Sequence, residues 1–255
     1  MKGHLGAAIA LVVGLGSSAF AADNPAPATA PVVKAAPAPS FSWTGCYVGV
    51  IGGGAWGDSE QIARSSSNAG ATITGNFRGN GGIAGGTIGC DYQIEKTVMG
   101  LENDASWTNL RGATQDLPPF NVQATSSTRE TWIDTLRGRV GYAFDHLLVY
   151  GTAGAAFAGT NVTASNPVGT FSDSKTRAGI AMGAGAEWAA WTGSWGAVSF
   201  RLEYLHTDFG SRQYFSTPVT VAGFTVVTRD VKLTDDIVRA GVNVRFNWGS
   251  TIVAK

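Results

Sequence analysis

The most constraining feature of the sequence is a two-residue alternation of apolar and polar side chains. It is clearest over 236–248, where Val238, Val242 and Phe246 share one face and Arg239 and Arg245 share the other. A period of two is that of a β-strand, whose successive side chains point to opposite faces. Segments of this kind recur through the chain, and we predict eight strands: about 43–57, 79–93, 98–107, 131–144, 147–160, 176–189, 197–209 and 235–248.

The connections between these segments alternate in length. Short ones are predicted at Glu95-Lys96, Asp145-His146 and Ala190–Gly196, and long ones at 58–78, 108–130, 161–175 and 210–234. Each segment also has the 9–11 residues that a tilted strand needs to cross hydrocarbon. The pattern predicts an all-β fold, an eight-stranded antiparallel transmembrane β-barrel of OmpA/OmpX-like size, with short periplasmic turns and long extracellular loops in the outer membrane of a Gram-negative cell.

Composition agrees with this fold and excludes others. Charged residues make up 14% of the chain, against about 25% in an average soluble domain. The 18 basic and 18 acidic residues balance, so no basic excess indicates a nucleic-acid partner. No apolar run has the roughly 18 residues of a transmembrane helix, and 44% hydrophobic residues are too many for a disordered chain.

The first 40 residues predict export. Lys2, the apolar stretch 9–16 and Ala19-Phe20-Ala21 are typical of a cleaved signal peptide at 1–21. Residues 22–40 hold five of the nine prolines among alanines, which predicts an extended periplasmic linker. The barrel domain is predicted at 41–248, and 249–255 as a short C-terminal tail. Loss of Lys2 leaves 17 basic and 18 acidic residues, a net charge of −1.

The charged face of the strands is predicted to line the barrel. An arginine on the lipid face costs about 2–4 kcal/mol at mid-bilayer, so the charges belong inside. A lumen of eight strands is narrow enough to be filled by side chains, and we expect paired charges to plug it. The predicted network is Asp91, Glu102, Asp104, Arg137, Arg139, Arg177, Glu187, Arg201, Glu203, Arg239 and Arg245.

Aromatic residues mark the predicted membrane boundaries. Tryptophan is enriched where a barrel wall meets the two membrane–water interfaces. The sequence places most of its tryptophans near predicted strand ends: Trp56, Trp107, Trp132, Trp188, Trp195 and Trp248.

Cys46 and Cys90 are the only cysteines. They are equidistant from Asn68, so a symmetric hairpin places them opposite one another in an oxidising compartment. The two readings are a disulfide and a pair of lipid-facing thiols. Two sulfurs with no nearby histidine do not indicate a metal site.

Few residues point to catalysis or ligand binding. After export only His146 and His206 remain, and no serine nucleophile converges on either, so we expect no catalytic residue, cofactor or metal. Haem ligation by His206 is an alternative. The last long loop carries apolar residues that indicate either a partner surface or packing across the barrel mouth: Phe215, Val219, Val221, Phe224, Val226 and Val227.

Two stretches carry a resemblance to a known family. Trp43-Thr44-Gly45-Cys46-Tyr47-Val48-Gly49 resembles the opening of the outer-membrane immunogenic proteins, small porin-like β-barrels of alphaproteobacteria. The segment with Arg239, Gly241, Val244 and Phe246 resembles the signal by which the barrel-assembly machinery recognises a last strand, although nine residues follow Phe246. The resemblance implies an eight-stranded barrel, envelope integrity and immunogenic loops.

The sequence therefore favours a non-enzymatic barrel with a structural or envelope-integrity role and antigenic or adhesive loops. Its expected partners are outer-membrane lipid, the barrel-assembly machinery and periplasmic chaperones, with loop contacts to host or cell surfaces. The alternative is a small porin or haemin-binding transport protein. A soluble periplasmic ligand-binding barrel is a third hypothesis, which fractionation would separate.

Overall fold

The computed structural model describes residues 41–64, 67–216, 219–221 and 224–246. The predicted signal peptide, linker and C-terminal tail lie outside these residues, as does Trp248. Among the described residues, no helix has the length and hydropathy to cross a membrane. The strands are β1 (Gly45–Ala63), β2 (Thr72–Ile94), β3 (Thr97–Thr108), β4 (Arg111–Gln115), β5 (Thr125–Phe144), β6 (Leu147–Asn166), β7 (Gly169–Gly193), β8 (Gly196–Tyr214), β9 (Val219–Val221), β10 (Phe224–Val226) and β11 (Arg229–Phe246).

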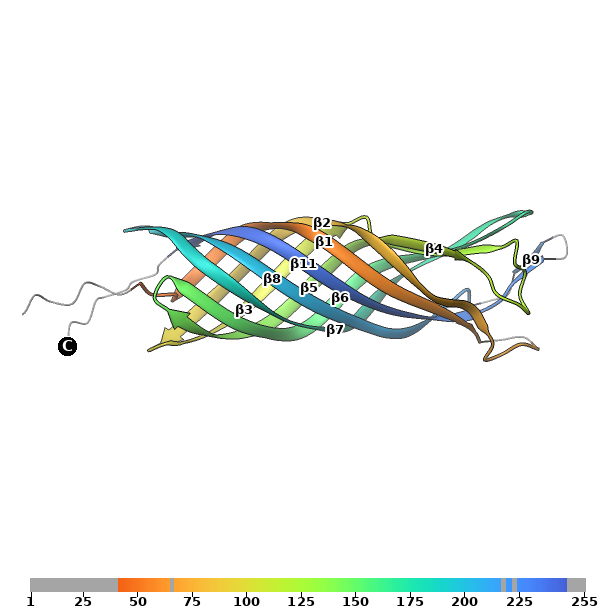
Figure 1. Cartoon of the computed structure of the whole chain (residues 1–255), viewed down its shortest axis with the longest axis horizontal. Coiled ribbons are helices and arrows are strands. Elements are labelled where there is room, and N and C mark those ends of the chain that lie inside the picture. The colour runs from red at the N-terminus through yellow and green to blue at the C-terminus, as the bar shows by residue number, and fades with distance from the viewer. Residues whose placement is uncertain (1–40, 65–66, 217–218, 222–223, 247–255) are drawn as a thin grey trace, which may run out of the picture. The chain divides into compact units, whose positions relative to one another are not determined.

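Eight long antiparallel strands close into a ring (Figure 1). Their order is β1-β11-β8-β7-β6-β5-β3-β2, and β2 pairs again with β1. β4 is a short extra strand between β2 and β5, and β9 with β10 forms a separate hairpin. The predicted eight-stranded antiparallel barrel is confirmed, and closure leaves no long edge strand unpaired.

The register of the ring gives the tilt of its strands. A line of paired residues that starts at Trp56 passes through Asp236, His206, Met182, Ala153, Gly138, Leu101 and Cys90 and returns to β1 at Cys46. The line returns ten residues away from its start, so the shear of the barrel is ten. With about 3.3 Å per residue and about 4.8 Å between strands, eight strands of this shear tilt by about 40°.

The strands continue well past the predicted ends. The segments 58–78 and 161–175, predicted as long loops, are mostly paired strand, and the β6–β7 connection is only Pro167-Val168. In the same way β8 runs on to Tyr214 and β11 begins at Arg229. The short connection predicted at 190–196 shrinks to Ser194-Trp195. The predicted bounds of the long connections were therefore wrong, because the barrel wall itself extends outward.

The outer surface carries an apolar band between two aromatic levels. Trp107 pairs directly with Trp132. The line of paired residues runs obliquely to the barrel axis because the strands tilt. When this is taken into account, Trp56, Trp107 and Trp132 lie at nearly the same height along the axis. Phe144 lies twelve residues after Trp132 on the same strand, β5. With about 3.3 Å per residue and a tilt of about 40°, it is about 30 Å closer to the periplasm along the barrel axis. This distance equals the thickness of the hydrocarbon core. Exposed aromatic residues near that lower level are Tyr92, Tyr142, Phe144, Trp188, Trp191 and Phe246.

These two levels place the membrane within the barrel wall. Trp56 and Trp132 lie inside their strands and not at strand ends as predicted, because β1 and β5 continue beyond the outer level. From Trp56 to Ala63 the wall rises by about 18 Å above that level. We call the part above the Trp56 level the extension.

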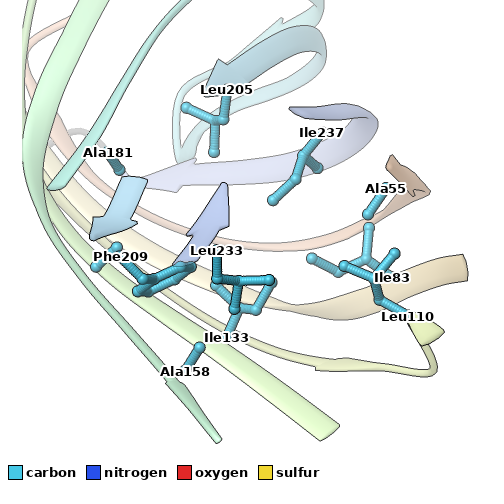
Figure 2. Packing of buried hydrophobic residues seen from close by; sticks show 11 residues of the cluster. Ala55, Ile83, Leu110, Ile133, Ala158, Ala181, Leu205, Phe209, Leu233 and Ile237 are labelled. Carbon is cyan, nitrogen blue, oxygen red and sulfur yellow. The ribbon is translucent and has the colours of Figure 1, made fainter. Parts of the chain in front are cut away.

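Buried side chains fill the ring in layers. A periplasmic cluster surrounds Trp43, which has no exposed surface. A layer of charges follows, and an apolar layer lies above it, where side chains from strands around the ring converge (Figure 2). Its members are Ala55, Ile83, Leu110, Ile133, Ala156, Ala158, Ala181, Leu205, Phe209, Leu233 and Ile237.

Candidate functional site: the charged lumen and the extracellular mouth

Arg137 on β5 forms the centre of the charge layer. Its Nη2 lies 2.5 Å from Glu102 Oε1 and 2.5 Å from Asp104 Oδ2, and its Nη1 lies 3.1 Å from Glu203 Oε1. All four side chains are at most 2% exposed. Alternation on β3, β5 and β8 turns these residues inward together, because each occupies the face opposite the lipid.

Two further arginines surround the same carboxylates. Arg201 contacts Glu102, and its Nη2 lies 3.1 Å from Asp104 Oδ1. Arg239 donates from Nε to Glu203 Oε2 at 2.7 Å and from Nη2 to Asp104 Oδ2 at 2.5 Å. Three guanidinium groups therefore face three carboxylates from β3, β5, β8 and β11. Charge-assisted hydrogen bonds of this kind are the strong ones in a low-dielectric interior.

A second group of charges lies on the periplasmic side. Arg139 pairs with Asp91 at 3.1 Å and with Glu187 at 2.9 Å, and Arg245 pairs with Asp91 at 2.7 Å. Arg245 also donates from Nη1 to the backbone carbonyl of Trp43 at 2.6 Å, which ties the periplasmic cluster to the charges. Both groups together hold five arginines and five carboxylates, so the buried layer is electrically neutral.

Several neutral residues complete the network and were not predicted. The hydroxyl of Tyr47 donates to Glu102 Oε2 at 2.5 Å and accepts from Arg139 Nη1 at 3.1 Å, so it joins the two groups. The hydroxyl of Tyr150 donates to Glu203 Oε1 at 3.1 Å. The parity of Tyr47, opposite to that of the lipid-facing Val48, could have indicated its inward position.

Arg177 corrects the predicted network. It is buried inside the ring, but its Nη2 donates to the backbone carbonyls of Gly210 at 2.6 Å and Val231 at 2.9 Å, and it forms no ion pair with the other ten residues. On β7 it lies at the height of the outer tryptophans, and the apolar layer separates it from the charges below. The prediction used strand parity alone, which does not distinguish heights in the lumen.

Glu102, Asp104 and Glu203 come close enough together to approach one cation. One oxygen from each lies within 4.8 Å of the others. Each of these carboxylates already accepts hydrogen bonds from at least two arginines. A cation would have to displace guanidinium groups, so the geometry favours a structural charge cluster.

Cys46 and Cys90 are joined by a disulfide in the structure. They form a directly opposed pair of the β1–β2 ladder, with Cα atoms 3.9 Å apart. Of the two readings left open by the sequence, the structure has the disulfide. The bond lies on the outward face at the periplasmic end of the first hairpin.

The hairpins of the extension are tied to one another at the mouth. Arg64 donates from its backbone amide to the Thr228 carbonyl at 2.8 Å, and the Leu117 amide donates to the Ile73 carbonyl at 2.7 Å. The Phe215 amide donates to Asp173 Oδ2 at 2.8 Å. These bonds connect β1 to β11, the β4–β5 connection to β2, and β8 to β7, so the rim is one packed structure.

Apolar residues of the last predicted loop lie inside this rim. Phe215, Val226 and Val227 are buried among Val162, Ile73 and their neighbours. Of the two predicted alternatives, these three residues therefore fit packing across the barrel mouth and not an exposed partner surface. The side chains of Val219, Val221 and Phe224 lie outside the described residues.

Comparison with known proteins identifies the family. The model of the outer membrane protein beta-barrel domain matches residues 7–246. The chain belongs to this outer-membrane β-barrel family. The predicted location in the outer membrane of a Gram-negative cell is thereby confirmed.

Relatives of this outer-membrane barrel are outer-membrane proteins of alphaproteobacteria. The chain is 32% identical to the 31 kDa outer-membrane immunogenic protein of Brucella melitensis biotype 1, over 96% of this chain and 100% of the relative. It is 30% identical to the 25 kDa outer-membrane immunogenic protein of Brucella abortus biovar 1, over 90% of this chain and 92% of the relative. A 22 kDa outer membrane protein of Rhizobium leguminosarum bv. viciae is 31% identical over 69% of each chain. The resemblance to the immunogenic proteins is confirmed.

Solved structures give more distant matches. The outer membrane protein OprG of Pseudomonas aeruginosa is 13% identical, with 80% of this chain and 97% of that chain covered and a TM-score of 0.43. The Ail protein of Yersinia pestis is 12% identical, with 78% and 99% covered and a TM-score of 0.34.

Both histidines of this outer-membrane barrel have acidic neighbours. His146 Nδ1 lies 2.5 Å from Asp145 Oδ2 in the periplasmic turn, and its ring stacks on Phe41. His206 Nδ1 lies 2.8 Å from Asp236 Oδ1 on the outward face, and the Tyr204 hydroxyl donates to the same oxygen at 2.6 Å. Neither histidine has a hydrogen bond to a serine hydroxyl among the described residues. The family consists of outer-membrane barrel proteins that are typically not enzymes.

The residues of the predicted assembly signal lie on β11, the last described strand. Arg239 faces the lumen, whereas Val244 and Phe246 face outward, and Phe246 is 42% exposed. Gly241 lies close to the Val50 carbonyl of β1, so a side chain there would push against the closing strand. Recognition of this strand by the assembly machinery remains a prediction.

Proposed function

We propose that this outer-membrane barrel has a structural, envelope-integrity role, with a lumen plugged by paired charges and a surface that presents antigenic or adhesive segments. The observation that carries the proposal is the neutral layer of five arginines and five carboxylates across the lumen. The Trp43 cluster below it and the apolar layer above it support the same reading. A lumen filled in this way favours a membrane body over a water-filled channel.

Conductance in planar bilayers tests the sealed lumen. We expect the purified barrel to give no steady current. The double substitution Arg137→Ser with Glu203→Ser removes two facing side chains without changing the net charge and should increase brief openings, whereas the exposed control Ser172→Ala should not. Gel mobility with and without boiling establishes that each variant is folded. Steady currents from the native protein would contradict the plug and favour the small-porin alternative.

The surface role is supported by the extension and by the relatives, which are described as immunogenic outer-membrane proteins. An epitope inserted between Pro167 and Val168, at the tip of the β6–β7 hairpin, should be labelled by antibody on intact cells. The matched insertion between Glu95 and Lys96 lies in a predicted periplasmic turn and should be labelled only after the outer membrane is opened. Equal labelling of both insertions on intact cells would contradict this orientation.

Envelope integrity is tested in a strain that lacks the protein. We expect such a strain to be more sensitive to detergent and to large antibiotics, with recovery when the native chain is supplied. The sealed, folded barrel should suffice, so a variant with altered tip residues should restore resistance as well. Unchanged resistance in the deletion strain would remove the envelope role and leave only surface presentation.

A further inference from the structure

The extracellular mouth contains a cavity that the structural role does not use. Its volume is about 620 Å³, and its walls come from the β1–β2 and β4–β5 connections together with β2, the outer end of β6, β10 and β11. This volume lies within the range of about 300–1,000 Å³ that is typical of small-molecule sites. All the strands that form it extend past the outer tryptophan level, so the cavity faces the environment.

The buried charged groups of the cavity form one connected chain. Arg229 and Asp116 both line the cavity and are 2% and 7% exposed. The Ser126 hydroxyl joins them, because it donates to Asp116 Oδ1 at 2.6 Å and accepts from Arg229 Nη1 at 2.7 Å. Arg229 Nη1 also donates to Gln61 Oε1 at 2.8 Å. One positive and one negative group balance, so the cavity favours a ligand without net charge.

The walls add neutral polar groups and an apolar face. The side chain of Gln123 is exposed and has no hydrogen-bond partner among the described residues. The side-chain oxygens of Asn121 and Asn166 accept backbone amides of their own turns, so their NH2 groups are available as donors. Phe120, which is half-buried, and the exposed Pro119 supply apolar surface beside these amides.

We propose that this cavity binds an uncharged saccharide of one to three sugar units. A sugar ring presents hydroxyl groups that both donate and accept, together with an apolar face of C–H groups. The amides of Asn121, Gln123 and Asn166 match the hydroxyls, and Phe120 with Pro119 matches the apolar face. The proposal extends the function of the barrel from presenting a surface to binding a ligand there.

The rigid rim favours such binding. The amide–carbonyl bonds from Arg64 to Thr228 and from Leu117 to Ile73 hold three of the cavity walls in place before a ligand arrives. A site whose walls are already ordered loses less conformational entropy on binding. Weak hydrogen bonds to hydroxyl groups can then add up to a measurable affinity.

Saturation-transfer NMR on the full barrel in nanodiscs without lipopolysaccharide tests the proposal. The probes are glucose, galactose, N-acetylglucosamine and maltotriose, with glucuronate as an acidic comparison. We expect transfer to at least one neutral probe, and Gln123→Ala should weaken its binding about fivefold, as the loss of one hydrogen bond implies. Gln115→Ala, an exposed glutamine on β4 outside the cavity, is the matched control and should bind as the native protein does. Heat-dependent gel mobility shows that each variant is folded.

Two results would overturn the proposal. One is the absence of transfer to every neutral probe, or transfer that Gln123→Ala and Gln115→Ala affect equally. The other is stronger binding of glucuronate than of any neutral sugar, since the balanced Asp116 and Arg229 do not favour an acid. A second set of nanodiscs that contain lipopolysaccharide identifies the source of the sugar. Loss of transfer there assigns the site to glycolipid of the same membrane, and unchanged transfer assigns it to sugars from outside.

Discussion

Below the level of Trp56 the barrel turns apolar side chains outward and carries a layer of charges inside. In the extension above that level polar side chains face outward, and apolar clusters lie inside beside the buried Arg229 and Asp116. On β11 the inward Arg239 and the outward Val242 lie in the membrane part. In the extension the inward residue is Leu233 and the outward residue is Lys232. The outward side chains change from apolar to polar because the surroundings of the barrel wall change from lipid to water.

The two regions therefore fill the same ring with different interactions. In the membrane part a neutral layer of paired buried charges lies between two apolar clusters, and every arginine of that layer must keep its partners. In the extension the filling is closer to that of a soluble protein, with clusters such as Val162, Tyr214, Phe215 and Val231. Stability should consequently depend on charge pairing below the outer tryptophans and on apolar packing above them.

The largest effect is expected when the central arginine of the membrane part is removed. Arg137→Gln leaves three buried carboxylates short of a partner, and we expect a loss of about 3–5 kcal/mol in the free energy of unfolding. The measurement is reversible urea unfolding of the barrel in lipid vesicles.

Arg64→Gln is the matched control for Arg137→Gln in the extension. Arg64 pairs with Asp230 at 2.9 Å but is 55% exposed, so its loss should cost under about 1 kcal/mol. Similar losses for the two variants would show that the charges of the two regions do not differ as described.

A smaller effect is expected from charges added to the outer wall. Leu202→Arg lies within the apolar band, where the residue is 61% exposed, and should cost about 2–4 kcal/mol in lipid vesicles. Ser172→Arg on the outward face of the extension should change stability by less than about 0.5 kcal/mol. Equal costs at the two positions would place the membrane boundary at another height.

The smallest effect is expected for the pKa values of two aspartates, Asp145 at the periplasmic end of the barrel and Asp116 at the extracellular mouth. In the periplasmic turn the hydrogen bond from His146 lowers the pKa of Asp145. At the mouth burial raises the pKa of Asp116. Asp145 thus adds stability above the ordinary aspartate pKa and loses it as the pH falls through its lowered value. Asp116 favours the fold more as the pH falls through its raised value.

Carboxyl carbon NMR titration in micelles measures both groups. We expect Asp145 to titrate below the ordinary value of about 3.9 and Asp116 above it. His146→Gln should return Asp145 toward that value without moving Asp116. Titration of Asp116 below Asp145 would contradict the assigned environments.

The sequence allowed all eight long strands to be predicted, but not their outer ends. Apolar side chains alternate in opposite phase on the two sides of Asp236, since Val231 and Leu233 before it face inward whereas Val238 after it faces outward. A single phase of alternation therefore ends at this point although the strand does not. The same change on β1, from Val50 to Asp58 on the outward face, made the strand look shorter than it is.

The charge layer could be predicted because each of its members must avoid lipid. Ten of the eleven predicted residues lie in it, and Arg177 does not because height in the lumen depends on the shear, which a single strand does not contain. Tyr47 was missed since its hydroxyl carries no charge. The mouth cavity was not predictable, because Asp116, Ser126 and Arg229 meet only through the register of several hairpins.

Closure of the ring has a consequence for the order of events during export. The ladder between β1 and β11 pairs Cys46 with Phe246, residues that are 200 positions apart. Contacts of such sequence separation form late, because a long segment of chain must first be brought together. One edge of β1 therefore stays without its β11 partner until the last strand has been exported across the inner membrane. During that interval the nascent protein would expose a strand edge, which predicts a holding factor in the periplasm.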